Sequence, residues 1–381
     1  MSTLRSTWHK TKFDKPFFWI SVAIIIIGLF IFFSAALSVL SSNPAQFYRM
    51  LISQLVLGLC GGIVVGFFLF RVPYTFWQKY ALHFFIGSLL ITALVFVPGL
   101  AQKHGGAIRW LNIGPFSFQP SELLKLTSIL YIAAWYSWAS TKINLKKLGI
   151  IPLGIICAIA GMLLLPQPDT DTLIVIVCAG TIIYFVSGMR ARDILILLVI
   201  AIIGSTALLS TQTYLQERMK TFLNPSSDML DTSWQLTQGF IAIGSGRLYG
   251  RGYGHSIQKF KYLPEATNDS IFAVVGEETG FIGSVFLIVL YLAFAFRGFY
   301  IARRSPTMFT RLIVVGLVSL VIVQSFLNIA AIVGVFPFSG LPLIFVSHGG
   351  TSLLFSIVIV ALILHISQYM QRVSVLNQSQ E

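Results

Sequence analysis

Long apolar runs, separated by short polar connections, fill most of the chain. A transmembrane helix needs about 20 consecutive, mostly apolar residues. The ten runs of about this length are residues 17–40, 50–70, 77–97, 119–138, 149–166, 172–188, 191–210, 269–297, 310–335 and 347–369. The pattern predicts an all-α polytopic membrane protein of about ten transmembrane helices, built as a single integral membrane domain over residues 1–381.

Basic residues predict the orientation of these spans, because Lys and Arg concentrate in the cytoplasmic segments of membrane proteins. With a cytoplasmic N-terminus, sixteen Lys or Arg residues fall in inner segments and only three in short outer loops. We therefore expect cytoplasmic tails at residues 1–16 and 370–381, in a protein of the cytoplasmic (inner) membrane. Residues 211–268, between spans seven and eight, are then a large extracytoplasmic loop.

Composition supports the membrane assignment and narrows the partners. The chain is 56% hydrophobic and only 10% charged, whereas soluble domains carry about 25% charged residues. A net charge of +13 suits basic loops against membrane lipids, so we expect no nucleic-acid partner. The three cysteines are widely spaced within apolar runs, a pattern that indicates neither a metal site nor a disulfide framework.

The first polar stretch of the predicted outer face is GGAIRWLNIGPFSFQPSELLKL, residues 105–126. Pro120 and Glu122 are typical of a helix start, since proline suits the first turn and an acid suits the positive end of the helix dipole. Lys125 follows Glu122 by three residues and shares its helix face. Two interpretations stay open: a local ion pair that holds the helix end, or charged groups that mark a cavity. Arg109 suits a position at the level of the lipid headgroups.

A second stretch, LLPQPDTDT at residues 164–172, places two acids beside two prolines. Asp169 and Asp171 could bind a hard cation through their carboxylate oxygens. Two carboxylates alone are a weak signal, and the pattern favours Asp171 as the cap of the helix that follows.

The long loop contains a helix-like piece, residues 232–243, and then a glycine-rich stretch from Gly244 to Gly254. Arg247 and Arg251 lie within this stretch. Glycine lets a backbone approach closely, and arginine binds phosphate oxygens through two parallel hydrogen bonds. The stretch therefore suits a pyrophosphate or an anionic headgroup; the alternative is a flexible basic loop near anionic lipid.

Acidic residues surround the start of the eighth span, KYLPEATNDSIFAVVGEETGFIG at residues 261–283. Asp269 can cap the helix that begins near Ser270, or it can be the group that carries the chemistry. Glu277 and Glu278 follow two turns later. Because an acid in lipid costs about 2.5–3.5 kcal/mol on the insertion scale, both should face protein or water.

Prolines and glycines break the segment FPFSGLPLIFVSHGGTSLL, residues 336–354. An irregular backbone at membrane depth must line a protein-buried or watery cavity. His348 is a candidate polar residue of that cavity.

Five motifs together resemble the SEDS family, the shape, elongation, division and sporulation proteins. They are RWLNIGPFSFQPSELLKL, QPDTDT, SWQLTQGFIAIGSG, YLPEATNDSIFAVVGEETGFIG and FSGLPLIFVSHGGTS, in the order of the family and across almost the whole chain. Within the family, GHSIQKFKYLPEA is more similar to the division members (FtsW) than to the elongation members (RodA).

The resemblance implies a peptidoglycan glycosyltransferase that polymerises lipid II, the undecaprenyl-pyrophosphate-linked disaccharide pentapeptide, at the outer face of the membrane during septal wall synthesis. It places the family's essential aspartate on Asp269, and conserved charged residues on Arg109, Glu122 and Lys125. It also implies a divalent cation (Mg2+ or Mn2+) without an organic cofactor, a class B penicillin-binding protein transpeptidase as partner, and other division proteins.

From the motifs and the resemblance together, Asp269 is the expected general base, and Lys125 is expected to couple closely to it. Arg109, Lys125, Arg247 or Arg251 would stabilise the departing pyrophosphate. The candidate substrate-binding residues are Arg247, Arg251, Gln235, Ser245, Gly246, Lys259, Glu265, Ser347 and His348.

The chain departs from the family pattern beside the expected base. Thr267 and Asn268 replace the usual His-Thr, Ser270 replaces Phe, and His348 stands where Tyr is common. Two other functions stay open: a lipid II flippase, which ten spans and a polar cavity also suit, and a catalytically weak division scaffold, which the altered residues favour. Synthesis of glycan strands from lipid II in detergent would distinguish a polymerase from both.

Overall fold

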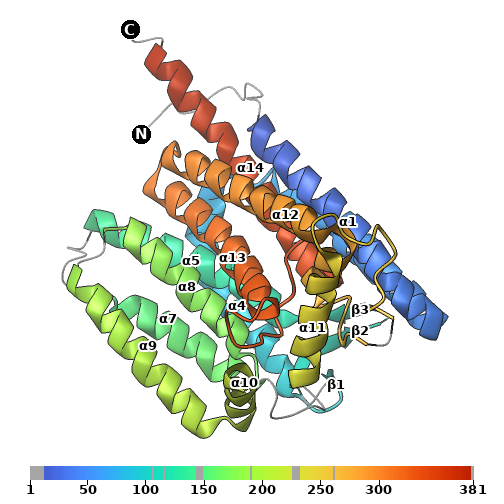
Figure 1. The fold of residues 1–381 in the computed structure, drawn as a ribbon. Helices are drawn as coiled ribbons and strands as arrows, with labels where there is room; N and C mark the ends of the chain where they lie inside the picture. The colour runs from blue at the N-terminus through green and yellow to red at the C-terminus, as the bar shows by residue number, and fades with distance from the viewer. Residues whose placement is uncertain are drawn as a thin grey trace.

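The computed structural model describes residues 13–104, 107–114, 116–142, 149–188, 191–224, 232–260 and 262–378. Helices make up most of it (Figure 1). The α-helices are α1 (Lys15–Ser42), α2 (Pro44–Ile52), α3 (Gly62–Leu69), α4 (Tyr74–Ala93), α5 (Pro120–Lys142), α7 (Ile151–Leu164), α8 (Thr170–Val186), α9 (Ala191–Thr211), α10 (Thr213–Leu223), α11 (Thr232–Gly246), α12 (Ile271–Arg303), α13 (Met308–Ile332) and α14 (Gly350–Gln378). A π-helix, η1 (Ser53–Gly61), joins α2 to α3, and a short 3-10 helix, η2 (Leu94–Phe96), follows α4.

A small antiparallel sheet corrects the all-α prediction. Its strands, in the order β1-β2-β3, are β1 (Ala101–His104), β2 (Ala107–Ile113) and β3 (Phe116–Phe118). Leu111 of β2 is paired with Ala101 on one side and with Phe118 on the other. The strands are too short to produce a long apolar run, so a search for membrane spans passes over them.

A helix is present at each of the ten predicted spans, but length and composition support fewer membrane crossings. The helices long and apolar enough to cross a membrane are Lys15–Ser42, Pro44–Leu69, Tyr74–Phe96, Ile271–Arg303, Met308–Ile332 and Gly350–Met370, six among the described residues. The α9–α10 pair, bent by 105°, would be a seventh if it counts as one span. Helices α7 and α8 are shorter, so the structure shows a polytopic helical bundle while the count of ten stays a prediction.

Helices α13 and α14 form the centre of the bundle. In their most apolar windows, 78% and 89% of the residues are buried, against 22% in the span made by α2, η1 and α3. Helix α13 contacts α5, α8 and α12, and Figure 1 shows it between them. The α2–η1–α3 span packs along α14 and leaves most of its apolar surface for lipid.

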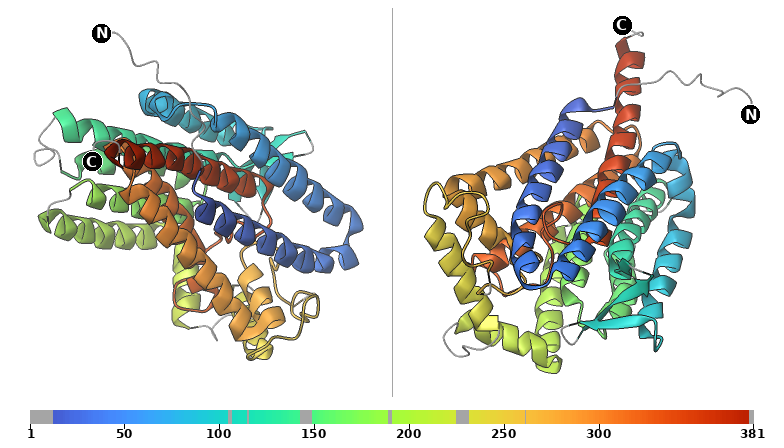
Figure 2. Two further views of the ribbon diagram at one scale, coloured as in Figure 1. Left: turned by 90° about the horizontal axis from the view of Figure 1, so that it is seen from above. Right: turned by 90° about the vertical axis from the view of Figure 1, so that its right-hand side faces the viewer.

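The start of α1 and the end of α14 lie at the same end of the molecule (Figures 1 and 2). Asp14 forms an ion pair with Arg297 of α12 at 2.7 Å, and its backbone N–H donates to Ser367 of α14 at 3.0 Å. Most of the predicted N-terminal tail, residues 1–12, lies outside the described residues. The predicted tail 370–381 is helical as far as Gln378.

The sheet, α10 and α11 lie toward the opposite end of the bundle (Figure 2). The predicted loop 211–268 is therefore structured over much of its length, by α10 and by α11, which packs on α12. Helix α11 confirms the helix-like piece expected at residues 232–243. Between α13 and α14, residues 333–349 are not helical, which confirms the broken segment.

Candidate functional site

Asp269 lies two residues before α12, which begins at Ile271. Its carboxylate accepts a hydrogen bond from the Gln235 amide of α11 at 3.3 Å, and the same amide donates to the Ser270 hydroxyl at 2.7 Å. The backbone carbonyl of Asp269 accepts a hydrogen bond from Asn328 of α13 at 2.7 Å. Helices α11, α12 and α13 thus position one half-buried carboxylate.

The surroundings of Asp269 raise its pKa to about 7. Burial makes the largest contribution, because it disfavours the charged form, and the nearby Glu265 carboxylate adds to it. The positive charge of Arg218 and hydrogen bonds from backbone N–H groups act in the opposite direction. The resulting pKa is suited to a group that takes up a proton near neutral pH.

Asp269 faces a cavity of about 570 Å³ that brings together residues far apart in the sequence. The predicted site residues among its lining are Arg109, Glu122, Glu265, Asp269 and His348. Lining residues that the sequence had not singled out include Gln46, Thr172, Arg218, Gly340 and Ser352. Helices α2, α5, α8, α10 and α14, strand β2 and the segment before α14 all contribute.

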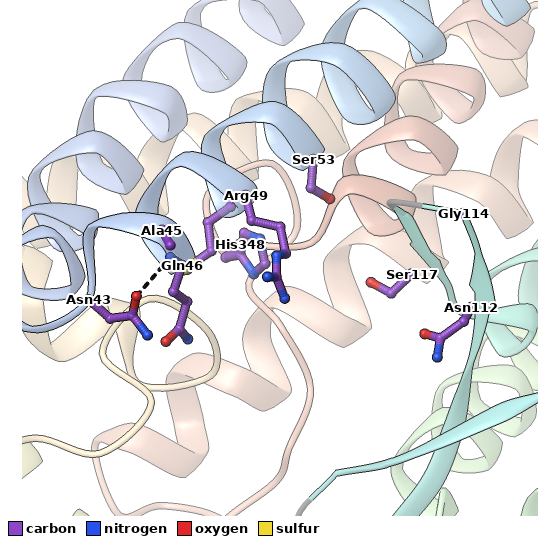
Figure 3. A pocket seen from close by; sticks show the side chains of 10 residues that line it. Asn43, Ala45, Gln46, Arg49, Ser53, Asn112, Gly114, Ser117 and His348 are labelled. Carbon is purple, nitrogen blue, oxygen red and sulfur yellow. Dashed lines mark hydrogen bonds between the residues drawn. The ribbon is translucent and has the colours of Figure 1, made fainter.

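A second cavity of about 720 Å³ adjoins the first (Figure 3). Gln46, Met50, Ser53, Ser117 and His348 line both. In Figure 3, side chains of α2, including Arg49, lie on one side of this cavity. The strand residues Asn112 and Ser117 lie on the other side. The site therefore consists of two adjoining compartments whose walls mix polar and apolar surface.

The segment before α14 is fastened to the loop that carries Asp269. The Ser347 hydroxyl donates to the carbonyl of Asn268 at 2.5 Å, and the backbone N–H of His348 donates to the carbonyl of Thr267 at 2.8 Å. The Asn328 amide, which binds the Asp269 carbonyl, also donates to the carbonyl of Leu341 at 2.8 Å. Ser347 is buried by these contacts, while His348 is at the junction of the two compartments.

Arg109 extends from β2 toward the start of α8. Its guanidinium donates to the backbone carbonyls of Gln167, at 3.2 Å, and Pro168. Asp171 of α8 instead pairs with Arg218 of α10 at 3.0 Å. The expectation that Asp171 caps α8 was wrong: Asp169 occupies the N-cap position, without a side-chain capping bond, and Asp171 bonds across to other elements.

Glu122 and Lys125 form the ion pair that their spacing indicates, at 2.8 Å, in a helix that begins at Pro120 as expected. The Lys125 ammonium, only 1% exposed, also donates to Gln324 of α13 at 2.6 Å. Gln324 in turn donates to the carbonyl of Pro342 in the cavity wall at 3.1 Å. Lys125 is thus linked through Gln324 to the cavity wall, and Arg218 is a cation that favours the ionised form of Asp269. The expected coupling of Lys125 to Asp269 stays a prediction.

Two predicted substrate-binding residues of the long loop pair with the acids of α12. Lys259 forms an ion pair with Glu278 at 2.6 Å and is fully buried, and Ser34 of α1 donates to the same carboxylate at 2.7 Å. Arg251 lies 3.5 Å from Glu277. These contacts explain how α12 holds two adjacent acids, and they place Lys259 and Arg251 outside the cavity lining.

The glycine-rich stretch packs on α12 at a break in that helix. Gly280 has φ 67° and ψ −164°, and the carbonyl of Arg247 accepts the N–H of Phe281 at 2.8 Å. Gly246 lies against the backbone of α12, and the Ser245 hydroxyl donates to its own helix. Arg247, Ser245 and Gly246 are therefore also outside the cavity lining.

The described residues include no group of three or more His, Cys, Asp or Glu side chains that could hold a metal ion. Asp169 and Asp171 do not form such a group with a neighbour. A site built from protein ligands alone is therefore not supported there, and we derive no step through a metal ion.

Arg218 is a charged residue of the cavity lining that the sequence motifs do not single out. Its guanidinium lies 5.4 Å from the ring centre of Tyr214, four residues earlier on α10. An aromatic and an arginine at this spacing share one helix face, so the pair was visible in the sequence. Its approach to Asp171 and to the cavity depends on tertiary packing and was not.

The whole chain resembles known proteins. Residues 15–372 match a family model described as cell cycle protein, covering FtsW, RodA and SpoVE. Stage V sporulation protein E of Bacillus subtilis (strain 168) is 33% identical over 365 residues, which are 95% of this chain and 99% of that protein. The probable peptidoglycan glycosyltransferase FtsW of Trichlorobacter lovleyi is 33% identical over 367 residues, 96% of each chain.

Solved structures share the fold. A peptidoglycan synthase complex that coordinates polymerization and crosslinking contains a chain with a TM-score of 0.76 and 25% identity, covering 95% of this chain and 99% of that one. The rod shape determining protein RodA of Thermus thermophilus has a TM-score of 0.67 and 26% identity, covering 93% and 96%.

Proposed function

The chain belongs to the FtsW, RodA and SpoVE family of cell cycle proteins, and we propose that it is a peptidoglycan glycosyltransferase that polymerises lipid II. Relatives named as peptidoglycan glycosyltransferases match it over almost their full length. The observation that carries the proposal is Asp269: a carboxylate with a pKa near neutrality, facing a polar cavity that also contains arginine side chains.

Asp269 would act as the general base. The hydroxyl oxygen of the acceptor sugar attacks the anomeric carbon of the donor, and the bond from that carbon to the pyrophosphate oxygen breaks with its electron pair. Asp269 takes the hydroxyl proton, on the face of the sugar opposite the leaving group as an inverting displacement requires. Arg109 would stabilise the negative charge that develops on the departing pyrophosphate.

The two adjoining compartments support a reaction between two large substrates. A polymerase must hold a donor and an acceptor at once, and the cavity of about 570 Å³ that Asp269 lines shares lining residues with the second cavity of about 720 Å³. His348 and Ser53, which line both compartments, would then lie where the two sugars approach each other.

The setting of the reaction follows from the predicted orientation. With both termini in the cytoplasm and ten spans, Asp269 and the 211–268 loop face the outside of the inner membrane, where lipid II is polymerised. We place the protein at the division septum from its similarity to FtsW proteins. A class B penicillin-binding protein is the proposed partner, since the similar solved complex couples polymerization to crosslinking. Dependence on Mg2+ or Mn2+ stays a prediction.

The test uses purified protein in detergent micelles with lipid II, and with the transpeptidase partner and a divalent cation added in separate arms. We expect the wild-type protein to make glycan strands, resolved on a gel, and Asp269→Asn to make none while keeping its melting temperature. Glu217→Gln is the matched control, since Glu217 is exposed on α10 and lies outside both cavities.

Glycan synthesis by Asp269→Asn at the wild-type rate would overturn the role of Asp269. A wild-type protein that makes no strands in any arm would overturn the polymerase. Lipid II movement between the leaflets of liposomes would then indicate a flippase, and its absence a scaffold.

A further inference from the structure

Two guanidinium groups, from strand β2 and helix α10, converge on Gly340 in the cavity wall. A Cβ placed on Gly340 would lie 3.6 Å from Nη2 of Arg218 and 3.9 Å from Nη1 of Arg109. Arg109, Arg218 and Gly340 all line the cavity that contains Asp269. Two like charges so close together are unfavourable unless a counter-charge or an anionic ligand lies between them.

The protein supplies one carboxylate partner for these two cations. Asp171 pairs with Arg218 at 3.0 Å, and the same oxygen accepts the backbone N–H of Gly340 at 3.1 Å. Arg109 donates only to neutral carbonyls in its described contacts. Asp169 also lines the cavity, but it forms no ion pair with either arginine in the described part of the chain. In the described part of the chain no carboxylate forms an ion pair with Arg109, so one of the two guanidinium groups keeps no carboxylate in direct contact, although Glu265 and Asp269 line the same cavity.

Both arginines are held in place before any ligand arrives. The guanidinium of Arg218 lies over the ring of Tyr214, whose hydroxyl bonds to Thr170 at the start of α8. Arg109 is fixed by the two carbonyls of the turn before α8. Side chains already fixed in the free protein lose less entropy on binding, so this arrangement suits recognition of an anion.

We propose that Arg109 and Arg218 form a two-arginine clamp that binds the pyrophosphate group of a prenyl-linked sugar substrate, and that Gly340 keeps the clamp open. The inference rests on the proposed function, which requires a pyrophosphate near Asp269. Planar guanidinium groups match phosphate oxygens through paired hydrogen bonds, and two of them can contact both phosphates. Arg218 and Gly340 thereby become substrate-binding positions in addition to Arg109.

Gly340 allows a sharp test of the clamp. A methyl group there would meet the arginine nitrogens at ordinary van der Waals distance, so the fold can accommodate Gly340→Ala. The same methyl group would occupy the point on which the two guanidinium groups converge. Gly340→Ala therefore blocks the ligand while leaving both arginines and the Asp171 ion pair intact.

The experiment compares Arg218→Gln, Arg218→Lys, Gly340→Ala and the control Lys220→Gln in micelles of neutral detergent. Lys220 is an exposed cation on the same helix and lines neither cavity. The readouts are the KM for lipid II and the inhibition constant of inorganic pyrophosphate. We expect both constants to rise about tenfold or more in Arg218→Gln and Gly340→Ala, less in Arg218→Lys, and not in Lys220→Gln.

An unchanged inhibition constant in a folded Arg218→Gln or in Gly340→Ala would overturn the clamp. If Arg218→Gln does not fold, Gly340→Ala decides. A parallel arm adds phosphatidylglycerol to the micelles; competition by this lipid, with none by pyrophosphate, would also overturn the clamp. If the wild-type protein makes no glycan strands, the proposed function fails separately, and the shift in melting temperature caused by inorganic pyrophosphate still tests the clamp.

Discussion

Asp269 illustrates how neighbouring charges set the chemistry of one residue. Burial and the Glu265 carboxylate favour its protonated form, whereas Arg218 and backbone N–H groups favour its ionised form. The balance leaves a pKa of about 7. Only the ionised carboxylate can accept a proton from the acceptor hydroxyl, so the fraction of active enzyme rises with pH through this value.

The pH dependence of polymerisation tests this balance. We expect kcat/KM of the wild-type protein to increase as pH rises through about 7. Glu265→Gln removes a negative charge beside Asp269, which lowers the pKa of Asp269 and moves the rising limb to lower pH. Measurement of kcat/KM from pH 5 to 9 with lipid II checks both expectations; Glu217→Gln should leave the limb in place. A limb that stays in place in Glu265→Gln would contradict the assigned interaction.

Lys125, unlike Asp269, does not line the cavity. Its ammonium group instead contacts the side chains of Glu122 and Gln324. With Lys125 replaced by Met, the Glu122 carboxylate, only 7% exposed, would lose its ion-pair partner, and an unpaired buried charge costs about 3–5 kcal/mol. Replacing both members, in Glu122→Gln with Lys125→Met, should restore most of the stability. Thermal unfolding in detergent measures the difference.

A double variant as unstable as Lys125→Met alone would contradict the pairing. The polymerisation rate of the double variant then tests whether the charged pair is needed for the reaction. A stable and active double variant indicates that neither charge takes part in catalysis, and a stable but inactive one indicates that Glu122, Lys125 or the wall that Lys125 contacts is required.

At the scale of elements, the contact between α11 and α12 depends on glycine. A Cβ on Gly246 would overlap the carbonyl oxygen of Gly276, and one on Gly280 would overlap the backbone of the facing loop. The break at Gly280 lets the glycine-rich stretch bond to α12. This contact positions Gln235, the α11 residue that binds Asp269.

Gly246→Ala should therefore separate α11 from α12. Overpacking of this kind typically costs about 1–3 kcal/mol, so we expect a lower melting temperature together with slower polymerisation. Gly244→Ala is the matched control, because nothing lies within 4 Å of a Cβ at that position on the same helix. Equal melting temperatures for the two variants would show that the helices do not approach as closely as described.

At the scale of the whole molecule, the number of membrane crossings decides on which side of the membrane the connection between α5 and α7 lies. The ten-span orientation puts the connection between α5 and α7 in the cytoplasm. An orientation with only the six long helices as spans puts it outside. Both orientations place Asp269 outside, so the position of this connection distinguishes them without affecting the proposed site.

Labelling of Asn144→Cys with a membrane-impermeant maleimide checks this prediction, in a variant whose three native cysteines are replaced by serine. We expect no labelling in intact spheroplasts and full labelling in inverted vesicles. Labelling from outside would support the six-span arrangement.

The sequence alone determined the membrane class, the start of α5 at Pro120, the Glu122–Lys125 pair and the broken segment before α14. Each depends on local physics: the length of apolar runs, the geometry of one helix turn, or the effect of proline and glycine on the backbone. The five ordered motifs also sufficed to indicate the family.

Tertiary structure alone decided which charged residues meet. The sequence suggested Arg247 and Arg251 for phosphate and Lys259 for substrate binding, yet all three lie outside the lining of both cavities. Arg251 and Lys259 instead pair with acids of α12. The sequence did not single out Arg218, yet this residue lines the cavity and pairs with Asp171, forty-seven residues earlier in the chain. The strength of an ion pair depends on distance and burial, and both are set by helix packing rather than by position along the chain.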